Sequence, residues 1–221
     1  MNPKVSSTAH FLTIGGFPKP FQDCYQSFVT RHPTWTTILW AEKDVDRLLK
    51  KHKELEYFNS LNSFINKYNF AKYLILADQG GWYVDLDISW SRGRGLDDLM
   101  KVKLAYRRSI PPEKRIHEPY PEIFIPVRTL PRQKQVNLRM NDDCLLFSNP
   151  GHFFDLIEFA KARSLLKSTD LTIPYEPFGP RAISEWIHTR TDLKRIYMFE
   201  DEIQVKGIYC DHANSKGWIF S

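Results

Sequence analysis

The chain has 221 residues, of which 42% are hydrophobic and 14% aromatic. This composition excludes a disordered chain and predicts one domain, residues 1–221, with a substantial core. The net charge of +5 and a pI near 9.0 indicate an anionic partner, which could be nucleic acid, a membrane surface or a phosphorylated small molecule. Lys and Arg are mostly scattered, which favours a solvated surface over a nucleic-acid footprint.

Cysteine usage and apolar runs bear on the compartment. Cys24, Cys144 and Cys210 are odd in number and widely spaced, so they form neither a disulfide framework nor a zinc spacing. No apolar run approaches the ~20 residues of a membrane span, and the N-terminus lacks the apolar stretch of a signal peptide. We therefore expect a cytoplasmic protein without a membrane span.

The first half of the chain alternates strand and helix patterns. Its predicted elements are a strand in residues 5–16, a helix over 21–32, a strand over 36–40, a short helix capped by Asp44, a helix of about five turns starting at Ser60, and a strand over 82–88. Gly15-Gly16 predicts a tight turn after the first strand, and Gly80-Gly81 ends the long helix. Strands alternating with helices predict an α/β sheet.

The second half begins with a stretch rich in proline and charge and without periodicity. Its predicted elements are a long surface loop or lid over residues 109–134, a strand over 144–148, a helix over 152–166, a turn over 173–180, a helix over 181–188, and late strands over 196–199 and 204–209.

The residues that suggest chemistry are Asp85 and Asp87. In a strand, residues i and i+2 point to the same side, so the two carboxylates are expected together, with Leu86 and Ile88 facing the core. Carboxylate oxygens on a rigid element suit Mn²⁺ or Mg²⁺, which could bridge to a diphosphate and neutralise it as it leaves.

A second Asp-x-Asp, Asp44-Val45-Asp46, lies where a helix should start, and there it serves better as cap and dipole partner. Asp85 and Asp87 differ, because they follow an otherwise apolar strand where acids are costly unless bound or exposed. Open α/β sheets also bind ligands at the carboxyl ends of their strands.

The stretch NFAKYLILADQGGWYVDLDISW, residues 69–90, resembles the motif region of the DXD-containing sugar transferases. That group includes the yeast outer-chain mannosyltransferases and the glucosylating domain of large clostridial toxins, in which a Ser-Asp-x-x-Arg helix leads through Gly-Gly-x-Tyr into Asp-x-Asp. Gly80, Gly81, Tyr83, Asp85 and Asp87 fit at that spacing. Asn69 stands at the Asp position of the helix and Lys72 at its Arg position.

The resemblance extends to both ends of the chain. The segment HFLTIGG, residues 10–16, is similar to the toxins' first strand, which contacts the nucleotide base. Thr13 replaces its stacking tryptophan, so Leu12 and Thr13 are expected to hold the base by backbone contacts while another aromatic stacks. His10 itself is expected to be a hydrogen-bonded core residue. Gly179-Pro180 and the ending from His212 to Trp218 also look like family segments.

The resemblance implies a GT-A fold, a Rossmann-like mixed sheet flanked by helices, in which residues 1–100 bind the nucleotide and 101–221 supply the acceptor side and a late metal and diphosphate segment. The implied site comprises metal ligands Asp87, Asp85 and His212, with Asn214 as an alternative to the last, and donor contacts Leu12, Thr13, Asn69, Lys72, Tyr83, Asp85, Ser215, Lys216 and Trp218. Acceptor-side candidates are Asp142 and Asp143, preceded by Asn141, although a turn before the following strand is the favoured interpretation of this run. Tyr68, Tyr73 and Trp90 are expected to be packing residues.

These features predict a hexosyltransferase of glycan biosynthesis that uses manganese or magnesium, a UDP-sugar in preference to a GDP-sugar, and a carbohydrate or glycoprotein acceptor. Retention of configuration is expected, as in the related groups, and a bacterial, toxin-like or large-virus enzyme fits the cytosol. Two alternatives stay open: a metal-dependent phosphoryl transferase or hydrolase, which lacks a Walker or kinase loop here, and a nucleic-acid-binding module, for which the pI is the main reason.

Overall fold

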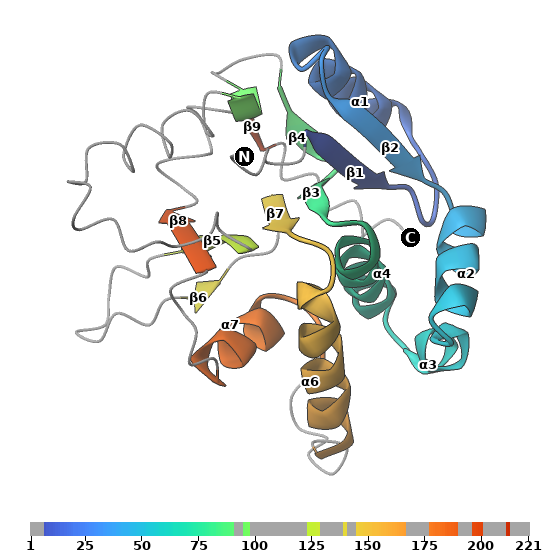
Figure 1. Cartoon of the computed structure of the whole chain (residues 1–221). Helices are drawn as coiled ribbons and strands as arrows, with labels where there is room; N and C mark the ends of the chain where they lie inside the picture. Colours follow the sequence, from blue (N-terminus) through green and yellow to red (C-terminus); the bar gives the residue numbers. More distant parts are fainter. Residues whose placement is uncertain are drawn as a thin grey trace, which may run out of the picture.

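A computed structural model (Figure 1) describes residues 7–90, 95–97, 123–128, 139–140, 145–166, 177–189, 196–200 and 211–212. The helices are α1 (Lys19–Arg31), α2 (Glu42–Lys51), α3 (Leu55–Ser60), α4 (Phe64–Gln79), α6 (His152–Leu166) and α7 (Pro180–Thr189). The strands are β1 (Thr8–Leu12), β2 (Thr36–Trp40), β3 (Gly81–Val84), β4 (Ile88–Ser89), β5 (Ile123–Arg128), β6 (Arg139–Met140), β7 (Leu145–Ser148), β8 (Ile196–Glu200) and β9 (Asp211–His212).

The main sheet is mixed. Its described strands run in the order β2-β1-β3-β7-β5-β6, with β8 also paired to β5, while β4 and β9 form a separate ladder. β1 is parallel to both β2 and β3, and β7 is antiparallel to β3 and to β5. The predicted mixed sheet flanked by helices is therefore confirmed.

Hydrophobic residues alternate along the strands and build a core on each face of the sheet. Leu12, Tyr83 and Leu146 pack with α2, α3, α4, α6 and α7 on one face. Phe11, Trp82 and Phe147 pack with Phe28 of α1 on the other face. Figure 1 shows α1 and α4 on opposite sides of β1 and β3. None of the described helices is long and apolar enough to cross a membrane.

The helix expected from Ser60 and the loop expected over residues 109–134 differ in the structure. The helix expected from Ser60 begins only at Phe64, as α4. Ser60 instead ends a preceding short helix, α3, and its hydroxyl donates to the Tyr57 carbonyl oxygen. The expected loop over residues 109–134 contains β5, whose apolar IFIPVR sequence pairs with β6, β7 and β8. The rest of that loop, and the strand expected over 204–209, lie outside the described residues.

Asp44 also sits one turn deeper in its helix than expected. Ala41 is the N-cap of α2, and the Asp44 carboxylate accepts a hydrogen bond from the Ala41 backbone N–H at 3.1 Å. That bond, with the bond from Arg47, lowers the pKa of Asp44. The capping role predicted for this second Asp-x-Asp is thus confirmed, although Asp44 stands in the first helical turn and not at the cap.

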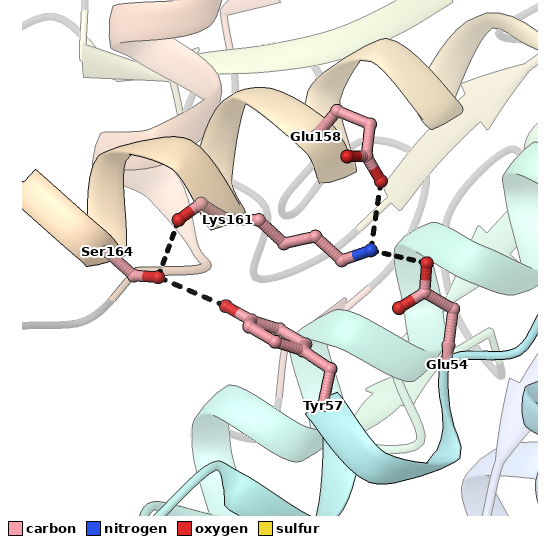
Figure 2. Close-up of polar contacts among 5 residues, drawn as sticks. All are labelled: Glu54, Tyr57, Glu158, Lys161 and Ser164. Carbon is pink, nitrogen blue, oxygen red and sulfur yellow. Dashed lines mark hydrogen bonds and ion pairs between the residues drawn. The ribbon is translucent and has the colours of Figure 1, made fainter.

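A polar brace joins α6 to α3 (Figure 2). The Lys161 ammonium pairs with Glu54 and, at 2.9 Å, with Glu158, and it lies 5.3 Å from the centroid of the Tyr57 ring. The Tyr57 hydroxyl contacts Ser164 Oγ at 3.3 Å. Burial disfavours the Lys161 charge, but the hydrogen bonds to the glutamates outweigh it and raise its pKa. The brace fixes α3 and hence the start of α4.

Two glycines allow β3 to begin directly against its neighbours. Gly80 (φ 65°) ends α4, and Gly81 (φ 92°) opens β3. A Cβ at position 81 would lie 2.9 Å from the Thr8 carbonyl oxygen, a backbone atom that cannot move aside without disturbing β1.

His10 connects the elements around this junction. Its Nε2 donates to the Gly80 carbonyl oxygen at 2.8 Å, and its Nδ1 accepts from Trp40 Nε1 at 3.1 Å. Only 1% of the residue is exposed, and burial lowers the pKa of His10 to about 4. The hydrogen-bonded core role predicted for His10 is confirmed, and the ring is neutral.

Gly81→Ala should destabilise the fold by at least about 2 kcal/mol more than Gly151→Ala, as read by denaturant unfolding. Gly151 is the matched control, because it also has positive φ (96°) but no atom within 4 Å of an added Cβ. Equal losses would show that β1 and β3 do not approach as closely as described.

The free energy of unfolding should fall as the pH drops from 6.5, the ordinary pKa of histidine, to about 4, the lowered pKa of His10. In this pH range the histidine is protonated in the unfolded state but neutral in the folded state. The free energy of unfolding therefore falls by up to about 3 kcal/mol across the range and does not change on this account above pH 6.5. In His10→Gln the amide can make both hydrogen bonds without titrating, so its loss should be smaller. A similar loss in both proteins would contradict the account. His32, also buried with a lowered pKa, supplies the remaining slope.

Candidate functional site

The two segments that carry the motifs meet at one edge of the sheet. β1 leads through α1 to β2 on one side, whereas β3 lies on the other side of β1. The parallel register of His10 with Tyr83 therefore brings the carboxyl ends of β1 and β3 together, with Leu12 and Asp85 at the same level. This is a topological switch point, where open α/β sheets bind ligands.

Asp85, Leu86 and Asp87 form a turn and do not continue the strand, which corrects the predicted strand over 82–88. β3 ends at Val84, and the Ile88 N–H donates to the Asp85 carbonyl oxygen at 3.2 Å. The expected alternation nevertheless holds, because Leu86 and Ile88 are buried and both aspartates are half-buried. The Oδ1 atoms of Asp85 and Asp87 are themselves buried, which is costly unless positive charge or donors compensate. Two carboxylates at a fixed turn suit a hard divalent cation.

The other residues that the motif singles out belong to β3 and α4 and are buried. Tyr83 is fully buried and its hydroxyl donates to the Tyr68 hydroxyl at 2.7 Å. The Lys72 ammonium lies 5.5 Å from the centroid of the Tyr83 ring, and Lys72 is only 2% exposed. Asn69 is 5% exposed on the same helix. The structure thus brings the Lys72 ammonium to the ring of Tyr83, two residues before Asp85.

The end of β1 has most of its backbone groups engaged. Leu12 is fully buried, and its carbonyl oxygen accepts a bond from the Tyr68 hydroxyl at 3.4 Å. The N–H and hydroxyl of Thr13 both donate to the Trp40 carbonyl oxygen, at 2.9 and 3.0 Å. A contact of Leu12 or Thr13 with a nucleotide base would therefore use the second lone pair of a carbonyl or hydroxyl oxygen. The backbone groups of Gly15 and Gly16, which follow, are more exposed.

The late candidate His212 lies in β9, a strand that pairs with β4 directly after the turn. β9 pairs with β4 in the register Ile88 with His212, which places His212 opposite the residue that follows Asp87. The remaining late and acceptor-side candidates lie outside the described residues: Asn141, Asp142, Asp143, Asn214, Ser215, Lys216 and Trp218.

A set of contacts that the sequence did not suggest ties the segment after the turn to α1. The Trp90 N–H donates to Ser27 Oγ at 2.8 Å, and the Leu96 N–H donates to His32 Nε2 at 2.8 Å. Trp35 Nε1 donates to Asp97 at 2.9 Å. Trp90 also packs edge-on against the Phe28 ring, as expected for a packing residue. None of these residues forms a local pattern, so only the fold reveals the contact set.

The donor set at the turn fits a divalent metal. Asp85 and Asp87 offer oxygen ligands of the kind that Mg²⁺ and Mn²⁺ take. No group of three or more His, Cys, Asp and Glu side chains gathers within the ranges that the structure describes. Further ligands would come from diphosphate oxygens, water or late residues of the chain.

Residues 18–101 match the family described as "Glycosyltransferase sugar-binding region containing DXD motif". Mannosyl phosphorylinositol ceramide synthase CSH1 of Saccharomyces cerevisiae is 34% identical over 88 residues, which cover 39% of this chain and 23% of the yeast protein. The match thus spans less than a quarter of that relative's length.

Two solved structures are similar at low sequence identity. PaToxG glycosyltransferase is 13% identical with a TM-score of 0.45, over 83% of this chain and 69% of that one. A glycosyltransferase involved in the glycosylation of the major capsid of PBCV-1 is 11% identical with a TM-score of 0.39, over 93% and 92%. Both TM-scores are too low to assign a fold. The family match identifies residues 18–101, which contain Asp85 and Asp87, as a glycosyltransferase sugar-binding region with a DXD motif.

Proposed function

We propose that this chain is a metal-dependent glycosyltransferase of the GT-A type. It moves a hexose from a UDP- or GDP-sugar, with UDP favoured, to a glycan or glycoprotein acceptor. The observation that carries the proposal is the position of the DXD turn at the switch point between β1 and β3, within the segment that matches the family. The family match covers residues 18–101 and not the rest of the chain. The activity of the whole protein is therefore proposed.

In this proposal the chain's own residues divide the work. Asp85 and Asp87 hold Mn²⁺ or Mg²⁺, which supplies the positive charge that stabilises a leaving diphosphate. Lys72 and Tyr83 support the turn, and the end of β1 faces the nucleotide. His212, Ser215, Lys216 and Trp218 complete the metal and diphosphate contacts, and Asp142 or Asp143 serves the acceptor. Transfer retains the anomeric configuration. The protein acts in the cytosol, a reducing compartment in which a free thiol such as that of Cys24 is stable.

Two other functions would use some of the same features. A metal-dependent phosphoryl transferase or hydrolase also needs paired aspartates and a cation. A nucleic-acid-binding module would account for the charge of +5. It would not explain why two half-buried carboxylates, Asp85 and Asp87, lie together at the end of β3. The family match at residues 18–101 favours the sugar transferase over both.

Calorimetric titration should show that one nucleotide or its sugar conjugate binds only with Mn²⁺. UDP-sugars and GDP-mannose belong in the panel, the latter because the yeast relative is named for a mannosylated product. Asp87→Ala should weaken binding at least tenfold, about 1.4 kcal/mol or more. Asp46→Ala, which changes the exposed aspartate of the second Asp-x-Asp in α2, should bind as the wild type does.

Equal binding by wild type and Asp87→Ala would contradict the proposed site. Metal-independent, salt-sensitive binding of RNA or DNA, with no nucleotide-sugar binding, would instead identify a nucleic-acid module.

Cys24 provides a second test that needs no nucleotide. Burial raises the pKa of the Cys24 thiol, and the negative charges of Asp87 and Asp23 raise it further. Mn²⁺ at the turn should offset the Asp87 charge and lower this pKa, so that iodoacetamide modifies Cys24 faster near pH 8. Peptide mass spectrometry separates Cys24 from Cys144 and Cys210.

The matched variant is Asp87→Asn, which should lower the Cys24 pKa without metal and abolish the response to Mn²⁺. If Mn²⁺ leaves the wild-type profile unchanged at saturating concentration, the ion does not bind at Asp87.

A further inference from the structure

Tyr68 lies where the parts of the candidate site converge. It belongs to the second turn of α4, is half-buried, and precedes Asn69. Its hydroxyl accepts a hydrogen bond from the Tyr83 hydroxyl at 2.7 Å and donates to the Leu12 carbonyl oxygen at 3.4 Å. Packing of the ring alone therefore does not describe what Tyr68 does.

The hydrogen bonds run in one direction, from Tyr83 through Tyr68 to Leu12. Tyr83 is two residues before Asp85, and Leu12 is the last residue of β1. A phenol has an ordinary pKa of about 10, so both hydroxyls carry their protons at neutral pH. The series of donors is therefore intact.

The Tyr83 ring is also held from other sides. It meets the Tyr68 ring at a centroid distance of 6.4 Å and an angle of 84°, and the buried Lys72 ammonium lies 5.5 Å from its centroid. Within the part of the chain that the structure describes, the hydrogen bond of the Tyr83 hydroxyl goes to the Tyr68 hydroxyl. Loss of the Tyr68 hydroxyl would leave a buried donor on Tyr83 without an acceptor, which costs more than loss of a matched pair.

We propose that Tyr68 is a positioning residue of the donor site: its hydroxyl joins the end of β1 to the strand that carries the Asp85–Asp87 turn. The two segments then move as one unit, so that the nucleotide side and the metal side of the crevice keep a fixed spacing. The effect on donor binding rests on the proposed function, whereas the coupling of the two segments does not.

The directed bonds predict an unusual order among three variants. Tyr68→Phe should be the most harmful, because it leaves the Tyr83 hydroxyl unsatisfied and removes the donor to Leu12. Tyr83→Phe should be milder, because Tyr68 keeps its bond to Leu12. The double variant should be less harmful than Tyr68→Phe alone, because the unsatisfied hydroxyl is gone. A residue that only packs would show no such rescue.

Two readouts are measured on the full chain. The first is amide hydrogen exchange in peptides covering residues 8–16 and 81–90, which should speed up in both peptides for Tyr68→Phe and return toward wild type in the double variant. The second is the affinity for the Mn²⁺–UDP complex, which should fall about tenfold for Tyr68→Phe. Tyr57→Phe is the control, because it removes a tyrosine hydroxyl contact of 3.3 Å in the α3–α6 brace.

Exchange in both peptides that is the same for Tyr68→Phe as for wild type and Tyr57→Phe would overturn the proposal. So would faster exchange combined with unchanged Mn²⁺–UDP affinity, since the spacing would then not matter to the donor. If the wild type binds no nucleotide, the proposed function fails, and the exchange order of the three variants still decides whether Tyr68 couples the segments.

Discussion

The contact between β1 and the start of β3 determines where the aspartates of the candidate site lie relative to the end of β1. His10 donates to the Gly80 carbonyl oxygen and accepts from Trp40, so one neutral ring links β1, β2 and the end of α4. Gly81 then lets β3 begin against Thr8 without a clash. Because β3 is only four residues long, fixing its first residue also fixes the turn that follows its last. The aspartates of the turn are in this sense positioned from the opposite end of the strand.

The two cores of the sheet hold the turn from opposite sides. On one face, Tyr83, Tyr68 and Lys72 contact one another where β3 leads into the turn. Tyr68 and Lys72 belong to α4, which follows the helix that the α3–α6 brace secures. On the other face, Ser27 and His32 of the α1 region hold the segment after β4 through backbone N–H groups. Acidic side chains that are half-buried need such a frame, since their mutual repulsion and desolvation would otherwise favour a rearranged turn. A frame of this kind keeps two carboxylates ready for a cation at little further cost in ordering.

Periodicity and turn residues predicted much of this fold. β2, α6 and α7 fall where the pattern placed them, within a residue or so, because their apolar spacing and their Gly and Pro boundaries agree with their tertiary contacts. The pattern failed where tertiary contacts decide. Ser60 resembles a helix cap but ends α3, and β5 is a strand despite Pro126 and the proline-rich surroundings, because its neighbours supply pairing that the local sequence does not signal.

In the candidate site, too, the sequence predicted the residues of local motifs and missed those placed by tertiary contacts. The spacing together with the preceding apolar strand singled out Asp85 and Asp87, which lie in the turn. The resemblance added Tyr83, Asn69 and Lys72, which the structure buries, with the Lys72 ammonium 5.5 Å from the centroid of the Tyr83 ring. The sequence assigned Tyr68 only to packing, because no motif predicts that its hydroxyl meets Tyr83 and Leu12. The contacts of α1 with Trp90 and Leu96 were missed for the same reason, since their partners are more than sixty residues apart in the chain.

The central claim is that the turn at the end of β3 holds a divalent cation beside the end of β1. The most direct test is a crystal of the protein grown with Mn²⁺ and UDP, with diffraction recorded to locate manganese by its anomalous signal. The account predicts one strong peak within ligand distance, about 2.2 Å, of carboxylate oxygens of Asp87 or Asp85, with the nucleotide beside Thr13. A manganese peak bound elsewhere, or nucleotide density away from the β1–β3 crevice, would contradict it.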